Sequence, residues 1–155
     1  MTTNEWISLL KEKFVTQVTQ IMTTRERRIY AETTPENLVQ VAEKLKQAGM
    51  INVGTMTGLD SGENFEVIYH FYDQQGNLLN MKVFTPRTAP KLPTITAIYP
   101  GVFLYEYELY DLLGIVVEGA PLGRRYPLPE NWPAGEFPLR KDWKGLPPQK
   151  VEVRS

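Results

Sequence analysis

The sequence of 155 residues contains no cysteine and a single histidine, His70. The lack of cysteine excludes disulfides, a thiolate nucleophile and cysteine-ligated zinc or iron–sulfur centres on this chain. A metal site around one histidine would need further ligands, and a lone histidine within a strand pattern is usually structural or on the surface. We therefore expect no metal ligand on this chain, and we assign no catalytic and no cofactor-binding residue.

Long hydrophobic runs and an excess of charge of one sign are also missing. No stretch approaches the roughly 18 apolar residues of a membrane-spanning helix, and residues 1–14 lack a basic segment followed by an apolar one. The net charge of −1 gives no electrostatic indication of nucleic acid or of an anionic membrane as a partner. We expect a cytoplasmic chain that does not cross a membrane itself, although it could belong to a complex that does.

Local signals predict two helices in the N-terminal third. Thr2 to Asn4 offer N-caps, and apolar residues recur behind them at helical spacing up to Phe14. The second helix is better defined, because Thr34 precedes Pro35 at its first position and Gly49 follows its last turn. Residues 14–21 stay ambiguous, and residues 28–32 are compatible with a short strand.

The hydrophobic period then changes to two. Phe65, Val67, Tyr69 and Phe71 alternate with more polar residues, which is typical of a strand with one buried face. Similar patterns over residues 50–59 and 78–85, joined by short turns, predict an antiparallel meander, followed by a connector over residues 86–93. The fold class that we expect is α+β. Residues 1–120 form the domain, with an antiparallel or mixed sheet and helices mainly on one face.

A third helix is predicted to open at Pro100 and Gly101 and to end before Gly114, with a short strand over residues 115–118. Its surface is apolar nearly all round, as in helices that are covered on most sides. It nevertheless contains three carboxylates. On a helical wheel two of them share one face and the first points roughly the opposite way. These residues are Glu106, Glu108 and Asp111. Because burial without a partner is costly for a carboxylate, we expect all three to need cations.

Residues 121–155 contain seven of the twelve prolines and should form an extended C-terminal arm that cannot build a core of its own. The arm supplies cations and large aromatic side chains. These are Arg124, Arg125, Arg140 and Lys141, with Trp132, Phe137 and Trp143. One hypothesis is that the ion pairs and aromatics fasten the arm to its own domain, and another is that they bind a partner subunit. A third hypothesis is an autonomous small-molecule enzyme that uses Glu108 and Asp111, but no histidine, serine or lysine stands in a context that would make them a catalytic pair.

Four segments between Phe65 and Lys144 resemble the 30-kilodalton subunit family of the proton-pumping NADH:quinone oxidoreductase, respiratory complex I. They are FEVIYHFYD, YEYELYDLLGI, EGAPLGRR and PLRKDW. The positions that match the family pattern include the three helix carboxylates, Gly114, Glu118, Gly119, Pro121, Arg124, Arg125 and the run Pro138 to Asp142. The chain departs from the pattern at Tyr107, Ala120 and Leu122–Gly123. The same family supplies a subunit to membrane-bound, energy-converting nickel–iron hydrogenases.

The resemblance implies a scaffold subunit without a redox cofactor in the hydrophilic arm of such a complex. Iron–sulfur clusters and the quinone site would lie on partner subunits. The implied partners are the large subunit related to nickel–iron hydrogenases and a small iron–sulfur subunit, and the C-terminal arm would bind its neighbours. The function implied is support of electron transfer to quinone coupled to ion translocation. The alternative within the family is the equivalent subunit of an energy-converting hydrogenase.

Overall fold

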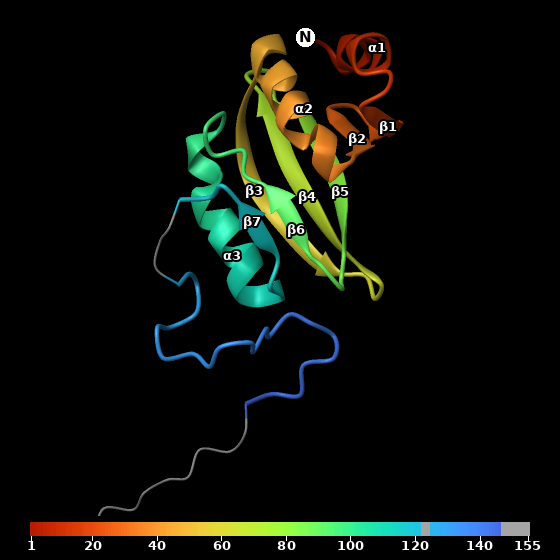
Figure 1. The fold of residues 1–155 in the computed structure, drawn as a ribbon. Helices are drawn as coiled ribbons and strands as arrows, with labels where there is room; N and C mark the ends of the chain where they lie inside the picture. Colours follow the sequence, from red (N-terminus) through yellow and green to blue (C-terminus); the bar gives the residue numbers. More distant parts are fainter. Residues whose placement is uncertain (122–124, 147–155) are drawn as a thin grey trace, which may run out of the picture.

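The computed structural model describes residues 1–121 and 125–146, which contain three α-helices, one short 3-10 helix and two sheets (Figure 1). In chain order the elements are α1 (Thr3–Lys13), β1 (Val18–Arg25), β2 (Arg28–Thr33), α2 (Pro35–Ala48), β3 (Met50–Asp60), β4 (Asn64–Asp73), β5 (Leu78–Pro86), β6 (Lys91–Pro93), η1 (Pro100–Val102), α3 (Phe103–Leu113) and β7 (Val116–Glu118). No helix in this described part is long and apolar enough to cross a membrane.

The main sheet has five strands in the order β1-β2-β5-β4-β3. Its strands β3, β4 and β5 form the predicted antiparallel meander, and β1 pairs with β2 in the same way. The pair β2 and β5 is parallel, so the sheet is mixed. Because α2, β3 and β4 separate these two strands in the chain, the connection has the length that a parallel pair requires. The α+β prediction is confirmed.

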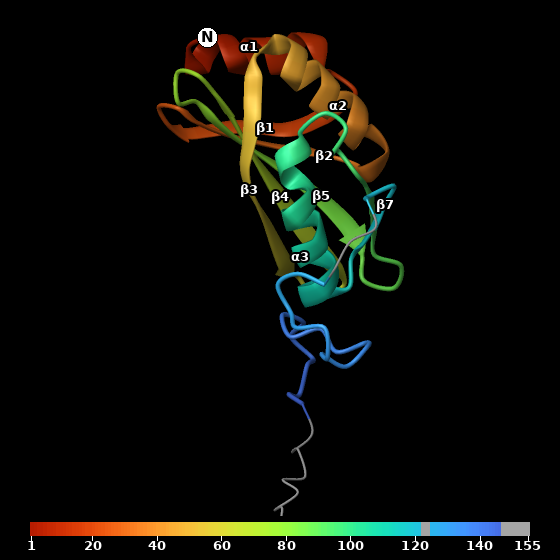
Figure 2. The ribbon, with the colours of Figure 1, turned by 90° about the vertical axis from the view of Figure 1, so that its left-hand side faces the viewer.

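One face of this sheet forms the core. Phe65, Val67, Tyr69 and Phe71 of β4 are fully buried, whereas the alternate side chains of β4 are only partly covered. α2 and α3 lie on the same side of the sheet, and the small parallel pair β6–β7 lies there with them (Figure 2). The alternate side chains of β4 point to the other face, where His70 is hydrogen-bonded to Thr57 and Asn80. This arrangement follows from the period-two pattern, since alternate side chains of a strand point to opposite faces.

The N-terminal helix α1 is hydrogen-bonded to the C-terminal end of β4. Thr2 and Glu5 form a capping box, as the N-cap signal predicts. The indole of Trp6 is buried and donates to Asp73 Oδ2 at 2.8 Å. Burial by itself would raise the pKa of Asp73, but the hydrogen bonds from Trp6 and Asn77 outweigh it and hold the pKa below its usual value.

The second helix keeps the predicted bounds. Pro35 occupies its first turn, and Gly49 ends it in the left-handed conformation at φ 112°. A residue with a Cβ is strained at this φ, so glycine is the suitable C-terminal residue. Thr34 stands at the N-cap position but makes no side-chain capping hydrogen bond.

Two local expectations need correction, and one open region is now assigned. Residues 14–21, which the sequence left ambiguous, lead into the strand β1, which adds an edge to the sheet. The predicted connector over residues 86–93 contains β6, which pairs in parallel with β7. The third helix opens as the 3-10 turn η1 and continues as α3. β6 has only three residues, which are too few to show a period-two pattern, so the local sequence does not predict it. The strand is defined by its pairing with β7, which is distant in the chain.

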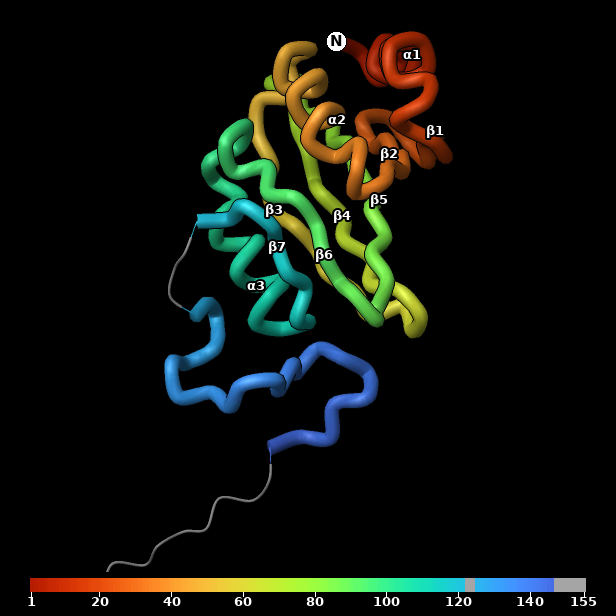
Figure 3. The backbone as a smooth tube through the Cα atoms, viewed as in Figure 1, coloured from red at the N-terminus to blue at the C-terminus, as the bar shows by residue number. Residues whose placement is uncertain are grey.

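The described part of the C-terminal arm, residues 125–146, contains neither helix nor strand. Its path runs beneath the C-terminal end of α3 (Figure 3). Figure 3 also shows that this path lies outside the sheet and helix layers. The irregular course agrees with the proline content of this segment.

Candidate functional site

The predicted site residues gather around α3 and the arm. Gly114 ends α3 in the left-handed conformation at φ 75°, and its amide donates to the carbonyl of Tyr110. The chain then turns at once into Ile115, which is buried. The three carboxylates of the helix lie in three different environments.

Glu106 is buried, with 1% of its surface exposed, and its partners are not cations. The hydroxyls of Thr94 and Thr96 donate to Oε2 at 2.7 and 2.9 Å, and the amide of Ile95 donates to Oε1 at 3.0 Å. The segment 94–96 thus binds this carboxylate with uncharged donors. Among the described residues no cation lies within 4 Å of it, so the expectation of an ion pair is wrong for Glu106. Sequence reasoning overlooked that hydroxyl and amide donors can satisfy a buried carboxylate.

Asp111 is also buried, and its main partner comes from the arm. Its side chain is 2% exposed, and Arg125 Nε donates to Oδ1 at 3.3 Å. The amide of Leu128 donates to Oδ2 at 3.2 Å. Arg125 also donates to the carbonyl of Trp132 within the arm. This is an inter-segment ion pair of the kind expected from the sequence, formed inside one chain.

Replacing Arg125 by alanine should lower the free energy of unfolding by about 2 kcal/mol, because the buried Asp111 carboxylate would lose its charged partner. Urea unfolding of the purified variant measures the change. The matched control is Lys91→Ala, which breaks the ion pair with Glu118. Both of those side chains are more than half exposed, at 59% and 58%, so we expect a change within about 0.5 kcal/mol. Equal effects of the two substitutions would contradict the burial argument.

A second ion-pair network was not anticipated from the sequence. Asp60, at the end of β3, has a side chain that is 2% exposed and accepts from Arg87 Nη1 at 2.5 Å. The amide of Lys141 donates to Asp60 Oδ2 at 2.8 Å, and Arg87 Nη2 also reaches Asp142 Oδ1 at 2.5 Å. Burial by itself raises the pKa of Asp60, but these hydrogen bonds and that from Gly62 outweigh it and lower the pKa to about 2. No spacing rule in the sequence connects Asp60 with residues 87 and 142.

Arg140 docks the arm onto the end of α3. Its Nε donates to the carbonyl of Leu113 at 2.7 Å, and its guanidinium lies over the rings of Phe65 and Phe137 at 5.2 and 4.4 Å. A Cβ at Gly114 would lie 2.5 Å from Arg140 Nη2 and 2.7 Å from the Phe137 ring. Glycine at position 114 therefore permits both the left-handed conformation that ends α3 and the close approach of the arm. No carboxylate within 4 Å pairs with Arg140 in the described part of the chain.

Three aromatic residues of the arm, Trp132, Phe137 and Trp143, are half-buried. The rings of Trp132 and Trp143 lie 6.1 Å apart, and both indoles donate to Glu136. Phe137 packs edge-on against Tyr110 of α3 at 6.3 Å. The arm thus folds back on its own domain here, whereas the sequence left open whether these rings need a partner. Lys141 contacts Asp60 through its backbone amide, and Lys141 itself is exposed. Arg124 lies outside the described residues.

Glu108 differs from the other two carboxylates. It is half-buried and lines a groove of about 260 Å³ between α3 and β3. The groove is lined by Met56, Thr57, Gly58, Tyr105, Glu108, Leu109, Leu112, Leu113 and Leu139. Asp111 is not among them, so this groove does not bring Glu108 and Asp111 together. That arrangement gives no support to the hypothesis of an enzyme that uses both carboxylates.

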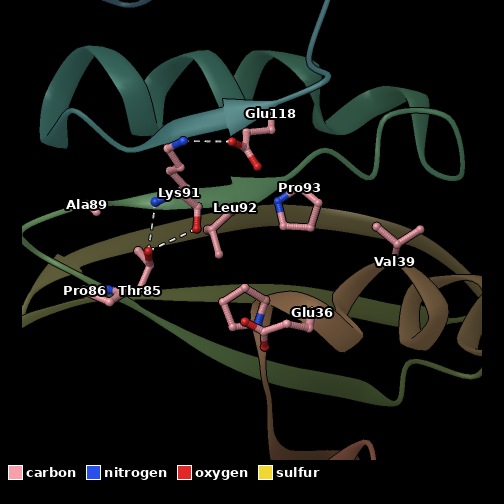
Figure 4. A pocket seen from close by; sticks show the side chains of 10 residues that line it. Glu36, Val39, Thr85, Pro86, Ala89, Lys91, Leu92, Pro93 and Glu118 are labelled. Carbon is pink, nitrogen blue, oxygen red and sulfur yellow. Dashed lines mark hydrogen bonds and ion pairs between the residues drawn. The ribbon is translucent and has the colours of Figure 1, made fainter.

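Another cavity, of about 440 Å³, lies between the start of α2, the end of β5 and the β6–β7 pair (Figure 4). Its lining includes prolines, Val39 and Leu92, with the exposed ion pair of Lys91 and Glu118 at its edge. None of the predicted site residues lines it. Within residues 1–121 and 125–146 there is no group of three side chains suited to hold a metal ion.

Large apolar side chains remain exposed along α3 and the arm. The exposed fractions are 39% for Phe103, 38% for Leu104, 49% for Tyr110, 43% for Tyr126 and 53% for Leu139. Single exposed apolar residues are common, whereas large contiguous apolar patches are typical of interaction sites. We call this set the α3–arm surface.

Comparisons with known proteins fit this geometry. The family described as the 30 kDa subunit of respiratory-chain NADH dehydrogenase matches residues 31–149. A chloroplast NAD(P)H-quinone oxidoreductase subunit of Cryptomeria japonica is 32% identical over 126 residues, covering 77% of each chain. The membrane-bound hydrogenase subunit beta of Pyrococcus furiosus is 37% identical over 97 residues, which are 60% of this chain and 56% of that protein.

The fold also matches a chain in the solved structure of the membrane-bound sulfane sulfur reductase, an archaeal respiratory membrane complex. The TM-score is 0.81 at 22% identity, covering 92% of this chain and 86% of that one. Several curated relatives are longer. The matched part spans 56% of the Pyrococcus furiosus protein and 46% of a Nocardioides NADH-quinone oxidoreductase subunit.

Proposed function

Since this chain belongs to the family of the 30 kDa subunit of respiratory-chain NADH dehydrogenase, we propose that it is a scaffold subunit of a membrane-associated oxidoreductase of the complex I type. In this role it supports electron transfer to quinone coupled to ion translocation. It binds the large subunit related to nickel–iron hydrogenases and a small iron–sulfur subunit of the same complex. It lies on the cytoplasmic side of the membrane and reaches the bilayer only through them.

The α3–arm surface is the observation on which this proposal depends. Residues 121–155 act as the partner-binding arm, and residues 1–120 form the domain that holds it in place. Arg125 and Arg140 fix the described part of the arm on α3, so that its outer side is presented in a defined conformation. A pre-ordered surface loses less conformational entropy on association than a free segment, which favours tight assembly.

The clusters and the quinone site of the complex belong to the partner subunits under this proposal. The chain has no cysteine to ligate an iron–sulfur cluster. The carboxylates Glu106 and Asp111 are occupied by donors of the chain itself, which suits a structural role for them. The chain therefore contributes shape and contacts to the complex, and no reacting group.

A second candidate within the family is the equivalent subunit of a membrane-bound, energy-converting hydrogenase. It is favoured by the 37% identity to the hydrogenase subunit beta of Pyrococcus furiosus. The two candidates share the scaffold role and differ in the electron donor or acceptor of the complex.

Affinity purification of the tagged full-length chain from solubilised membranes of its native host tests the proposal. We expect a large hydrogenase-related subunit and a small iron–sulfur subunit to be recovered with it in near-equal amounts, as measured by quantitative mass spectrometry. An NADH-oxidising module in the same preparation would indicate complex I, and nickel in the large subunit would indicate a hydrogenase. Recovery of the bait alone, as a monomer, would contradict the scaffold role.

A further inference from the structure

The groove that contains Glu108 lies at an open edge of the main sheet. β3 is the last strand in the sheet order, so one of its sides has no neighbouring strand. Met56, Thr57 and Gly58 all line the groove, although successive side chains of a strand point to opposite faces. The groove therefore follows the edge of β3, and not the face beneath α3. α3 forms its other wall, because an added Cβ at Gly58 would lie 2.6 Å from Leu113 Cδ1.

An edge strand offers backbone donors and acceptors to another chain. The hydroxyl of Tyr105 donates to the carbonyl of Gly54 at 2.9 Å and so closes one end of this edge. Further along, the wall of the groove is apolar and includes Leu109, Leu112 and the half-exposed Leu139. Its volume of about 260 Å³ is below the usual range for small-molecule sites, which favours side chains of a protein segment as its occupant.

Glu108 is the one acidic side chain on the wall of this groove. Within the described residues it is neither hydrogen-bonded nor ion-paired, unlike Glu106 and Asp111 on the same helix. A half-buried carboxylate beside leucine side chains is poorly solvated, so a counter-charge that covers it is favourable. An approaching acidic segment would be repelled by the same carboxylate.

We propose that this groove binds an extended segment of a partner subunit, with apolar side chains against Leu112 and Leu139 and an arginine or lysine paired with Glu108. The inference rests on the proposed function and specifies one surface and one chemistry for it. Arginine fits best, because its planar guanidinium can bind the carboxylate with two hydrogen bonds while its stem lies along the apolar wall.

The test uses the full-length chain in its native host, with a photo-cross-linking amino acid in place of Leu139 at the groove. The same amino acid replaces Tyr126 on the arm in a second strain and Glu43, exposed on α2, in a third. Irradiation of intact membranes precedes solubilisation, and mass spectrometry maps the linked peptides. We expect the probe at position 139 to link to a partner-subunit peptide that contains arginine or lysine, and the probe at position 43 not to reach that peptide.

Substitutions of Glu108 then test the charge pair. Glu108→Gln should lower the recovery of the mapped partner at least tenfold, whereas Glu43→Gln should leave it unchanged. Glu108→Arg should abolish recovery, and a reciprocal change of the mapped basic residue to glutamate should restore it. Because Glu108 makes no hydrogen bond in the described part of the chain, thermal unfolding of the isolated Glu108→Gln variant should match that of the unsubstituted chain.

Three outcomes would overturn the groove proposal while leaving the proposed function intact. They are a link from position 139 to a second copy of this chain, a link to a segment without a basic residue, and recovery of the partner by Glu108→Gln within twofold. The same holds if the probe at position 126 links to a partner subunit and the probe at position 139 does not. If no position links and the bait is purified alone, both the groove proposal and the scaffold role fail.

Discussion

Glu106→Ala is expected to lower the free energy of unfolding of the isolated chain by about 3–5 kcal/mol. The substitution removes a buried acceptor and leaves the Thr94 and Thr96 hydroxyls and the Ile95 amide without their partner. It also leaves a cavity between the segment 94–96 and α3, which adds to the loss. Urea unfolding followed by circular dichroism measures the total effect. Hydrogen exchange of the Ile95 amide should accelerate strongly in the native state, because its hydrogen bond is lost.

Two further variants in α3 serve as controls for this result. Glu106→Gln keeps the size of the side chain and one acceptor oxygen, and a threonine hydroxyl can reverse its role to accept from the new amide. We expect a loss of about 1–2 kcal/mol for it. Glu108→Ala removes a half-buried carboxylate without a hydrogen bond in the described residues, so a change within about 0.5 kcal/mol is expected. A loss below about 1 kcal/mol for Glu106→Ala would show that the observed hydrogen bonds do not stabilise the fold.

Asp60→Ala should cost about 3 kcal/mol and loosen the arm. The substitution removes the acceptor for Arg87 and for the Lys141 amide, and it leaves the partly buried Arg87 with Asp142 alone. Trp132 and Trp143 pack together in the arm, so their fluorescence should shift toward that of exposed indole. Asp142→Ala is the control, since its side chain is 70% exposed and its loss should cost about 0.5 kcal/mol. Unchanged tryptophan fluorescence in Asp60→Ala would contradict the role of this carboxylate in fixing the arm.

The same carboxylate predicts an acid dependence of stability. Asp60 has a pKa of about 2 in the folded chain, against its ordinary value of 3.8. The unfolded state therefore binds more protons between these values, and stability falls as the pH is lowered through them. The stabilisation that the ionised Asp60 carboxylate gives to the folded state is fully present above about pH 4 and is lost near pH 2. The difference in unfolding free energy between the unsubstituted chain and Asp60→Asn should thus shrink from pH 5 to pH 2. A difference that stays constant over this range would contradict the lowered pKa.

Features that depend on neighbours in the chain were predictable from the sequence. The alternation over β4, the N-cap Thr2, Pro35 in the first turn of α2, and the glycines that end α2 and α3 each act within one or two turns or along one strand. The α+β class followed from these elements, and the resemblance followed from motifs in α3 and the arm. Docking of the arm on its own domain was also one of the hypotheses from the sequence, because the arginine residues of the arm were candidate partners for the carboxylates.

The partners of each buried charge could not be obtained in this way. Glu106 is bound by residues 94–96, Asp111 by Arg125, and Asp60 by Arg87 and the arm, and none of these pairs has a fixed spacing in sequence. The sequence likewise does not predict the parallel pairing of β6 with β7 or the position of Glu108 at the edge of β3. Local propensity and periodicity specify which elements form and which face of each is apolar. Which side chains meet depends on how the elements pack, because a buried carboxylate accepts any donor that the packing brings within hydrogen-bond distance.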